Sequence, residues 1–243
     1  MFNIFKKKNT SPKKFLKTDL HSHLLPQLDD GVESFSEALE IIKGLKSLGY
    51  NKIITTPHVM YDFYDNTPET ILDQLKSLQK EIQENEIDID LQASAEYYLD
   101  ENLVEMVSKK PEKLLTFGDN YFLFETSFMN EPFYLQEFIF EAKSKGLNPI
   151  MAHPERYAYI HSDFSKIEDL INRGVLMQVN INSFSGYYSK EVKKTAEKLV
   201  DKGLVHFIGS DCHNLKHFAV MQKSVTEKYY KKALDLPLLN ERL

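Results

Sequence analysis

Residues 34–58, SFSEALEIIKGLKSLGYNKIITTPH, contain one complete unit of the pattern that decides the fold. Ser34, with Glu37 three residues later, is typical of a capped helix start, and apolar residues then recur at helical spacing up to Gly49. Glycine at that position is typical of a helix end. A short apolar run follows, which predicts a buried strand, and His58 lies just beyond it. The segment therefore predicts a helix, a strand, and a polar side chain at the carboxyl end of that strand.

The same alternation continues along the chain. The predicted strands are residues 17–23, 52–56, 89–97, 121–126, 148–153, 176–180 and 205–210. The predicted helices are residues 34–48, 68–85, 132–145, 165–173 and 189–202. Seven alternations without a Pro-, Gly- or Ser-rich linker predict one parallel α/β domain, which fits both a closed barrel and an open doubly wound sheet. Neither the phosphate loop GxxxxGK[ST] nor the fingerprint GxGxxG is present, which disfavours a nucleotide-binding open sheet.

Composition and charge narrow the function classes. The chain has 243 residues, of which 42% are hydrophobic and 27% charged, as in ordinary globular proteins. No apolar run approaches the ~18 residues of a transmembrane helix. The lone cysteine excludes an internal disulfide and favours a reducing, cytoplasmic compartment.

Residues 1–17 differ from the rest in charge. They contain six lysines and no acid, so the remaining 24 basic and 36 acidic residues leave a formal charge of −12. Such an acidic body disfavours nucleic-acid binding. We expect residues 18–243 to form the folded domain. The basic stretch is either a flexible lead-in or a weak contact with the anionic inner face of a membrane.

Histidines and acids gather at one end of the predicted strands. Eight of them lie at or just beyond a carboxyl strand end: His21, His23, His58, Glu96, Glu125, His153, Asp211 and His213. In α/β barrels the loops at that end form the active site, which favours the barrel here. Burying so many imidazoles and carboxylates together without a cation would be very costly, so we expect a metal site. The remaining histidines, His161, His206 and His217, are predicted to be structural or surface residues.

The type of ligand restricts the metal. Imidazoles and carboxylates without a thiolate set suit zinc, manganese or iron, and eight or nine ligands suit two or three ions that share bridging carboxylates. Such clusters generate a hydroxide nucleophile near neutral pH and hold the oxygens of a phosphoryl group.

Several motifs resemble the polymerase and histidinol phosphatase (PHP) superfamily. They are DLHSHLLPQLDDG (19–31), TTPH (55–58), AEYY (95–98), ET (125–126), AHPERY (152–157) and SDCHN (210–214). The LLPxxDDG and HPERY segments resemble its bacterial protein-tyrosine phosphatase branch, which acts in capsule and exopolysaccharide systems. The resemblance implies a distorted (β/α)₇, TIM-like barrel and a manganese-preferring phosphatase with a trinuclear centre. It also implies a phosphotyrosine protein as substrate, such as the tail of a bacterial tyrosine kinase.

The resemblance also implies a role for each site residue. His21, His23 and Asp211 would hold one ion, and Glu125 would bridge. The other two ions would be held by Asp30, His58, Glu96, His153 and His213, with Asp29 as an alternative to Asp30. Arg156 would bind the phosphate, with Asp211 and His213 as further catalytic residues. A second arginine expected after the last motif is missing, so Lys216 or His217 replaces it, or that contact is lost.

The sequence argues against a cysteine nucleophile and leaves two alternatives to a protein-tyrosine phosphatase open. Cysteine-dependent dephosphorylation needs an arginine six positions after the cysteine, but Phe218 stands there, so we expect Cys212 to be a packing residue. A phosphatase of the histidinol-phosphate type, acting on a small molecule, would use nearly the same metal site. A non-catalytic, metal-stabilised binding module is the third reading.

Aromatic residues near the predicted loops either flank a phosphotyrosine ring or pack in the ordinary way. They are Tyr61, Phe63, Tyr64, Tyr97, Tyr98, Tyr157, Tyr187 and Tyr188.

Overall fold

The computed structural model describes residues 15–243. The predictions for the basic stretch therefore lie almost wholly outside the described residues. Within the described part of the chain, none of the helices combines the length and the apolar character that crossing a membrane would require.

In the part of the chain that the structure describes, nine short parallel strand segments form the centre of the fold. They are β1 (Thr18–Asp19), β2 (Lys52–Thr55), β3 (His58–Val59), β4 (Asp90–Ala93), β5 (Glu96–Tyr98), β6 (Tyr121–Glu125), β7 (Asn148–Ala152), β8 (Leu176–Asn180) and β9 (Phe207–Gly209). One sheet has the order β1-β2-β4 and the other β3-β5-β6-β7-β8-β9. Two residues separate β2 from β3, and two separate β4 from β5, so each pair is one interrupted strand. The barrel thus has seven strand positions, as expected, with two of them broken.

The ends of the strand series meet. Ser22 and Cys212 form a parallel bridge, and the His23 amide donates to the Cys212 carbonyl oxygen at 2.9 Å. Below them, the amide and hydroxyl of Ser210 donate to the two carboxylate oxygens of Asp19 at 2.8 and 2.7 Å. These contacts place the first and last strands side by side, so the structure confirms the distorted barrel.

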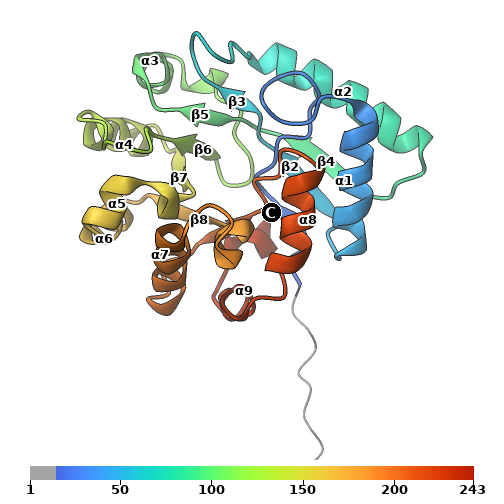
Figure 1. Ribbon diagram of the computed structural model, residues 1–243. Helices are drawn as coiled ribbons and strands as arrows, with labels where there is room; N and C mark the ends of the chain where they lie inside the picture. Colours follow the sequence, from blue (N-terminus) through green and yellow to red (C-terminus); the bar gives the residue numbers. More distant parts are fainter. Residues whose placement is uncertain (1–14) are drawn as a thin grey trace, which may run out of the picture.

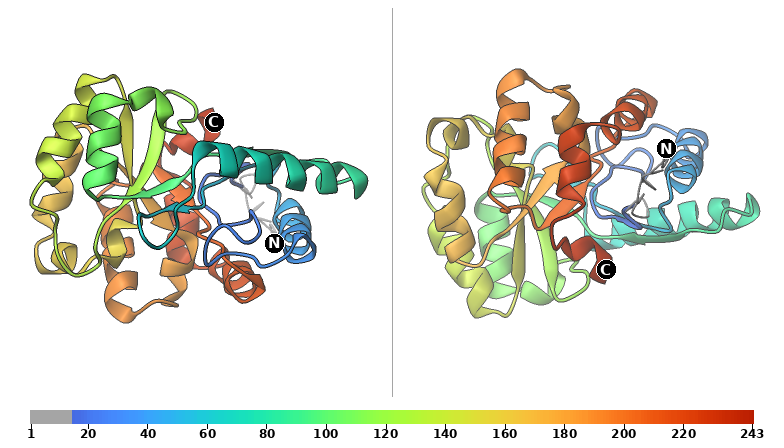
Figure 2. Two further views of the ribbon diagram at one scale, coloured as in Figure 1. Left: turned by 90° about the horizontal axis from the view of Figure 1, so that it is seen from above. Right: turned by 90° about the horizontal axis from the view of Figure 1, so that it is seen from below.

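Within residues 15–243, nine helices surround the strands, and they follow one another around them in chain order (Figure 1). They are α1 (Phe35–Ser47), α2 (Pro68–Glu84), α3 (Glu101–Lys109), α4 (Leu135–Ser144), α5 (Ala158–Ser162), α6 (Ser165–Asn172), α7 (Lys190–Asp201), α8 (Leu215–Ser224) and α9 (Lys228–Ala233). Short 3₁₀ turns are η1 (Pro111–Lys113), η2 (Pro154–Arg156), η3 (Ile181–Ser185) and η4 (Leu239–Arg242). The ring closes where α8 packs against α1, and α2 projects beyond the body (Figure 2).

The five predicted helices are present, with ends within three residues of the prediction. At the start of α1 the Ser34 side chain accepts from the Glu37 amide as expected, but the Glu37 carboxylate accepts from the amide of Glu33 rather than that of Ser34. The helices α3, α5, α8 and α9 were not predicted.

The interior of the barrel is apolar below the polar strand ends. Leu20, Ile54, Leu123, Ile150 and Phe207 belong to one inner hydrophobic cluster. Along β6, Phe122 and Phe124 belong instead to the larger outer cluster under the helices, because successive side chains of a strand face opposite sides. Glu125, two residues after Leu123, lies on the same inner face at the carboxyl end of the strand, where the site is.

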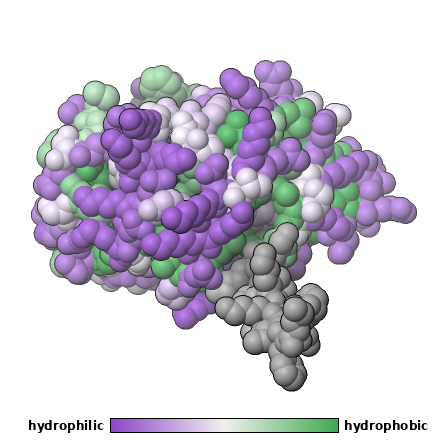
Figure 3. Space-filling view, turned by 60° about the horizontal axis from the view of Figure 1, so that its bottom comes forward, coloured by the Kyte–Doolittle hydropathy of each residue, from purple (hydrophilic) through white to green (hydrophobic). Residues whose placement is uncertain are grey.

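The outer cluster includes residues from Leu16 to Leu238. One outer face is mainly hydrophilic with hydrophobic residues interspersed (Figure 3), as is usual for a folded protein in water.

Substituting Gly44 by alanine tests the closure of the helix ring. A Cβ atom there would lie 2.3 Å from the ring of Phe218 on α8, so the two helices would have to move apart. Although alanine favours a helix by about 1 kcal/mol over glycine, we expect a net loss of about 1–3 kcal/mol in the free energy of unfolding, measured with urea. The double variant with Phe218→Leu should lose less free energy of unfolding than the two single variants lose together. Strictly additive losses would contradict this packing.

Candidate metal centre

The structure brings all nine predicted ligand residues together over the carboxyl ends of the strands. Their ligand atoms form four overlapping groups, each within 4.8 Å. The groups are His23, Asp30, His58 and His213; His21, His23 and Glu96; His21, His153 and Asp211; and His58, Glu96 and Glu125. Because the groups share members, they describe one continuous cluster.

Glu96, at the start of β5, lies in the middle of this cluster. One carboxylate oxygen is 3.1 Å from His21 Nε2 and 3.3 Å from His58 Nδ1, and the other is 2.9 Å from His153 Nε2. Burial alone would raise the pKa of this wholly buried carboxyl, but the facing imidazoles of His21 and His58 hold it well below its usual value. Glu96 belongs to two of the four groups, whereas Glu125 belongs to one.

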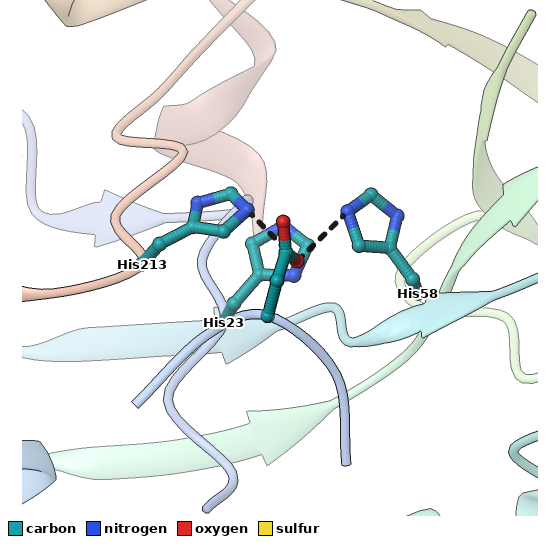
Figure 4. A group of neighbouring side chains, drawn as sticks. His23, His58 and His213 are labelled. Atoms are coloured by element: carbon teal, nitrogen blue, oxygen red, sulfur yellow. Dashed lines mark ion pairs between the residues drawn. The ribbon is translucent and has the colours of Figure 1, made fainter. Parts of the chain in front are cut away.

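Asp30 and the imidazoles of His58 and His213 form the outer part of the cluster. Figure 4 shows these two imidazoles on either side of His23. Asp30 Oδ1 is 3.6 Å from His58 Nε2 and 3.5 Å from His213 Nε2. The ring of His213 stacks on that of His23, with centroids 3.9 Å apart. The Asp30 side chain is 56% exposed, so this part of the cluster faces solvent.

Asp29 has a different role from Asp30. Its buried carboxylate lies 2.7 Å from His23 Nδ1 and also accepts from the amides of His58 and Gly31. A Cβ atom on Gly31 would lie 2.3 Å from the His23 carbonyl oxygen, so the loop can make this close approach only with glycine. Asp29 thus orients His23, and Asp30 is left to face the cluster.

Strand β8 supplies two orienting residues that the sequence analysis missed. Gln178 Oε1 lies 2.8 Å from His21 Nδ1, and its amide nitrogen donates to Asn180 Oδ1 at 2.8 Å. Asn180 in turn donates to Asp211 Oδ2 at 2.6 Å. Partners on the far side of a ligand fix its tautomer and direction. Two polar residues two apart in an otherwise apolar strand were the available signal.

Asp211 connects the cluster to Arg156. Its Oδ2 accepts from Asn180, from Arg156 Nη1 at 3.1 Å and from the Tyr188 hydroxyl at 3.2 Å. Its Oδ1 is 3.4 Å from the Nε2 atom of His21. The two oxygens therefore face different partners.

Arg156 is held between two aromatic rings. Its guanidinium carbon lies 4.7 Å from the ring centroid of Phe128 and 4.4 Å from that of Tyr188. The side chain is 25% exposed, so part of the guanidinium faces the open side of the site. This arrangement fixes the plane of the group.

A cavity of about 390 Å³ joins the cluster to Arg156. Tyr64, Phe128, Tyr187, Tyr188 and His217 also line it. Of the aromatic residues considered from sequence, Tyr97 and Tyr157 are instead buried in the core.

The histidine and lysine on α8 differ from expectation. His217 lines the cavity, and its ring packs against those of Tyr187 and His213. Its placement favours His217 as the replacement for the expected arginine and disagrees with the other prediction, that it is a structural or surface residue. Lys216 is exposed and does not line the cavity, which does not support its predicted substrate contact. The side chain of Asn214 caps the start of α8. Successive side chains of a helix point in directions ~100° apart, so Lys216 and His217 face different sides of α8.

The donor set fits divalent cations. His21 and His23 each direct Nδ1 to an orienting partner, so their Nε2 atoms face each other at 3.3 Å beside carboxylate oxygens. Burial opposes charge on His21, but Glu96 and Asp211 outweigh it and raise its pKa to about 9. Facing lone pairs need a shared positive charge, which protons or metal ions supply. His58 Nδ1 is also buried without a hydrogen-bond partner.

Imidazoles and carboxylates at this end of a parallel β/α barrel define a metal-dependent hydrolase. Residues 17–235 match the family described as "Capsular polysaccharide synthesis, CpsB/CapC", and the chain belongs to this family. This confirms the resemblance drawn from the motifs.

Relatives agree with this family. The chain is 30% identical over 199 residues to the tyrosine-protein phosphatase YwqE of Bacillus subtilis, covering 82% of this chain and 78% of the relative. It is 28% identical to the tyrosine-protein phosphatase CpsB of Streptococcus pneumoniae, covering 92% of this chain and 96% of the relative.

Solved structures share the fold. A structure from work on YwqE and CpsB, described as unique metal-dependent tyrosine phosphatases, superposes with a TM-score of 0.82 at 28% identity and covers 93% of each chain. A histidinol phosphate phosphatase from Lactococcus lactis, at 12% identity and a TM-score of 0.54, covers 88% of this chain and 94% of its own, and shows the fold alone.

Replacing Gln178 by leucine tests the orienting role of β8. Leucine has about the volume of the glutamine side chain but lacks the acceptor beside His21 Nδ1. We therefore expect the fold to be retained and the metal affinity to fall by about ten- to a hundredfold. Metal titration followed by elemental analysis measures the effect. Gln92→Leu, at an exposed position on β4, is the matched control. Equal metal affinity in both variants would contradict the role.

Proposed function

We propose that the protein is a metal-dependent phosphatase that hydrolyses phosphotyrosine on proteins. One observation carries the proposal: Asp211 joins Arg156, a phosphate-binding type of side chain, to the cluster of metal-ligating groups in a single cavity. The family and the tyrosine-phosphatase relatives support the same reaction.

Two or three divalent ions, with manganese as the first candidate and iron, zinc or magnesium as alternatives, would be held by the nine predicted ligands. The four groups of ligand atoms overlap, because His21, His23, His58 and Glu96 each belong to two of them. We assign the shared position to Glu96 rather than to Glu125, because Glu96 lies within 3.3 Å of His21, His58 and His153. When bound, such ions supply positive charge and a water nucleophile at neutral pH.

The residues of the chain position the substrate. Arg156 lies over the rings of Phe128 and Tyr188, is hydrogen-bonded at Nη1 and lines the cavity, so its remaining N–H groups would be available to donate to phosphoryl oxygens there. We keep Asp211 and His213 as predicted catalytic residues within the metal centre. A phenolate leaves with a pKa near ~10, so it needs less protonation than a serine alkoxide.

A cysteine nucleophile does not operate at this site. Cys212 is wholly buried, and burial raises the pKa of its thiol far above the usual range. It packs in the outer hydrophobic cluster, as expected.

We further propose that the protein acts in the cytoplasm on the tail of a bacterial tyrosine kinase. The capsular polysaccharide family supports this partner, and the single buried cysteine is consistent with a reducing compartment. Weak membrane contact through residues 1–17 remains part of the proposal.

Kinetics on three substrates test the reaction. With Mn²⁺ added, we expect a phosphotyrosine peptide to be hydrolysed with a higher kcat/KM than a phosphoserine peptide or histidinol phosphate. Chelation should abolish phosphate release, whereas Cys212→Ala should keep it. Faster hydrolysis of histidinol phosphate would favour the small-molecule alternative, and metal content without turnover on any substrate would favour a binding module.

Arg156→Lys tests the phosphate contact. Lysine keeps the charge but loses the planar, stacked donor group, so kcat/KM for the peptide should fall by about 10²–10³-fold while metal content stays constant. Arg173→Lys, at a surface ion pair with Asp169, is the matched control. Full activity in Arg156→Lys would remove this residue from the mechanism.

A further inference from the structure

A second cavity lies directly beside the metal-centre cavity. It also has a volume of about 390 Å³, and Met60 lines both. A smaller cavity of about 230 Å³ shares Tyr64 with the metal-centre cavity and Tyr61 with the second one. The three cavities are therefore neighbours, and together they lead from the metal centre outward. We call its outer part the shelf, defined by Tyr61, Phe63, Tyr98, Asp100, Glu101 and Tyr134.

The shelf exposes apolar side chains that the fold leaves uncovered. Tyr61 is 59% and Phe63 72% exposed, although both are large and apolar. Exposed aromatic residues grouped around a cavity are typical of binding surfaces rather than of ordinary surface. The shelf is built where β3, β5 and α3 lie next to one another (Figure 1).

Local hydrogen bonds hold the shelf in place relative to the metal centre. The amides of Phe63 and Tyr64 donate to the Met60 carbonyl oxygen at 3.1 and 2.7 Å, which closes a tight turn. Asn66 then donates to the carbonyl oxygens of Leu28 and His58 at 2.8 Å. The ring of Tyr64 also stacks on that of His58. The aromatic turn is thus attached to two loops of the metal centre.

The two cavities differ in the positive groups that they offer. The metal-centre cavity has carboxylates too, but histidines face them, the proposed metal ions would neutralise them, and an arginine lies beside them. The charged residues that line the second and smaller cavities are Asp65, Asp100 and Glu101, with no lysine or arginine among these lining residues. The metal-centre cavity offers Arg156 to an anion. One end therefore suits a phosphoryl group, and the other suits apolar and cationic side chains, which also stack on aromatic faces.

We propose that the shelf binds the residues that flank the phosphotyrosine on one side and selects a flank with an apolar and a basic side chain. This inference rests on the proposed phosphatase activity and specifies its substrate as a peptide segment of that chemistry. Residues beyond the phosphorylated ring would follow the shared lining of Met60 and Tyr64 onto the shelf.

Three substrates separate the shelf from the catalytic centre. They are p-nitrophenyl phosphate, which has no flank, and two phosphotyrosine peptides of equal length with either lysine and leucine or glutamate and serine beside the phosphotyrosine on both sides. For the native protein we expect kcat/KM to be at least tenfold higher for the basic peptide than for the acidic one.

Two variants test the residues of the shelf. Phe63→Ser should lower the ratio of kcat/KM for the basic peptide to that for p-nitrophenyl phosphate by about tenfold, through KM. Glu101→Gln should reduce the preference for the basic over the acidic peptide by about threefold. Phe140→Ser, at a 70% exposed position of α4 that lines neither cavity, is the control and should leave both ratios at the native values.

The outcomes distinguish the two proposals. If none of the three substrates is hydrolysed by the metal-loaded protein, the proposed function fails. If p-nitrophenyl phosphate and both peptides are hydrolysed but the peptides are equivalent, or Phe63→Ser behaves like Phe140→Ser, the phosphatase stands and the shelf proposal is overturned.

Discussion

The structure depends on one electrostatic constraint: imidazoles and carboxylates are packed against one another at the buried end of a barrel. Glu96 alone faces three imidazoles within 3.3 Å and has no access to water. Such a cluster is stable only when positive charge is shared among its members. The orienting contacts follow from the same constraint, because Asp29 and Gln178 turn the free nitrogens of His23 and His21 inward, where that charge must lie.

The backbone departs from regular geometry where this cluster requires it. His153 and Asp211 both have left-handed conformations, with φ of 34° and 49°, which are uncommon for residues other than glycine. Each follows the end of a strand and turns its side chain back over the barrel. The interruption between β2 and β3 includes Pro57, which lacks an amide donor, and it directs His58 into the site. Strain of this kind is found where function overrides local preference.

Much of this could be predicted from the sequence, for a physical reason. A polar residue directly after a buried strand has one place to go in a parallel barrel, so His58, Glu125 and His153 were placed correctly from pattern alone. Asp29 and Asp30 were not separable, because the turn of a loop decides which carboxylate faces inward. Gln178 and Asn180 were missed because polar residues within a strand fit several roles. Lys216 and His217 were not separable either, because which of them faces the cavity depends on how α8 packs, which is a tertiary effect.

The arrangement of charge also bears on how a substrate enters. The acidic body repels a phosphoprotein at long range, so attraction must come from the centre and from Arg156 at short range. Acids on the shelf make the opposite orientation unfavourable, because a phosphoryl group placed there would face Asp100 and Glu101 instead of a guanidinium. The same negative charge attracts basic side chains beside the phosphotyrosine. Repulsion at one end and attraction at the other therefore favour a single direction of binding, in which the phosphorylated ring enters the metal centre first.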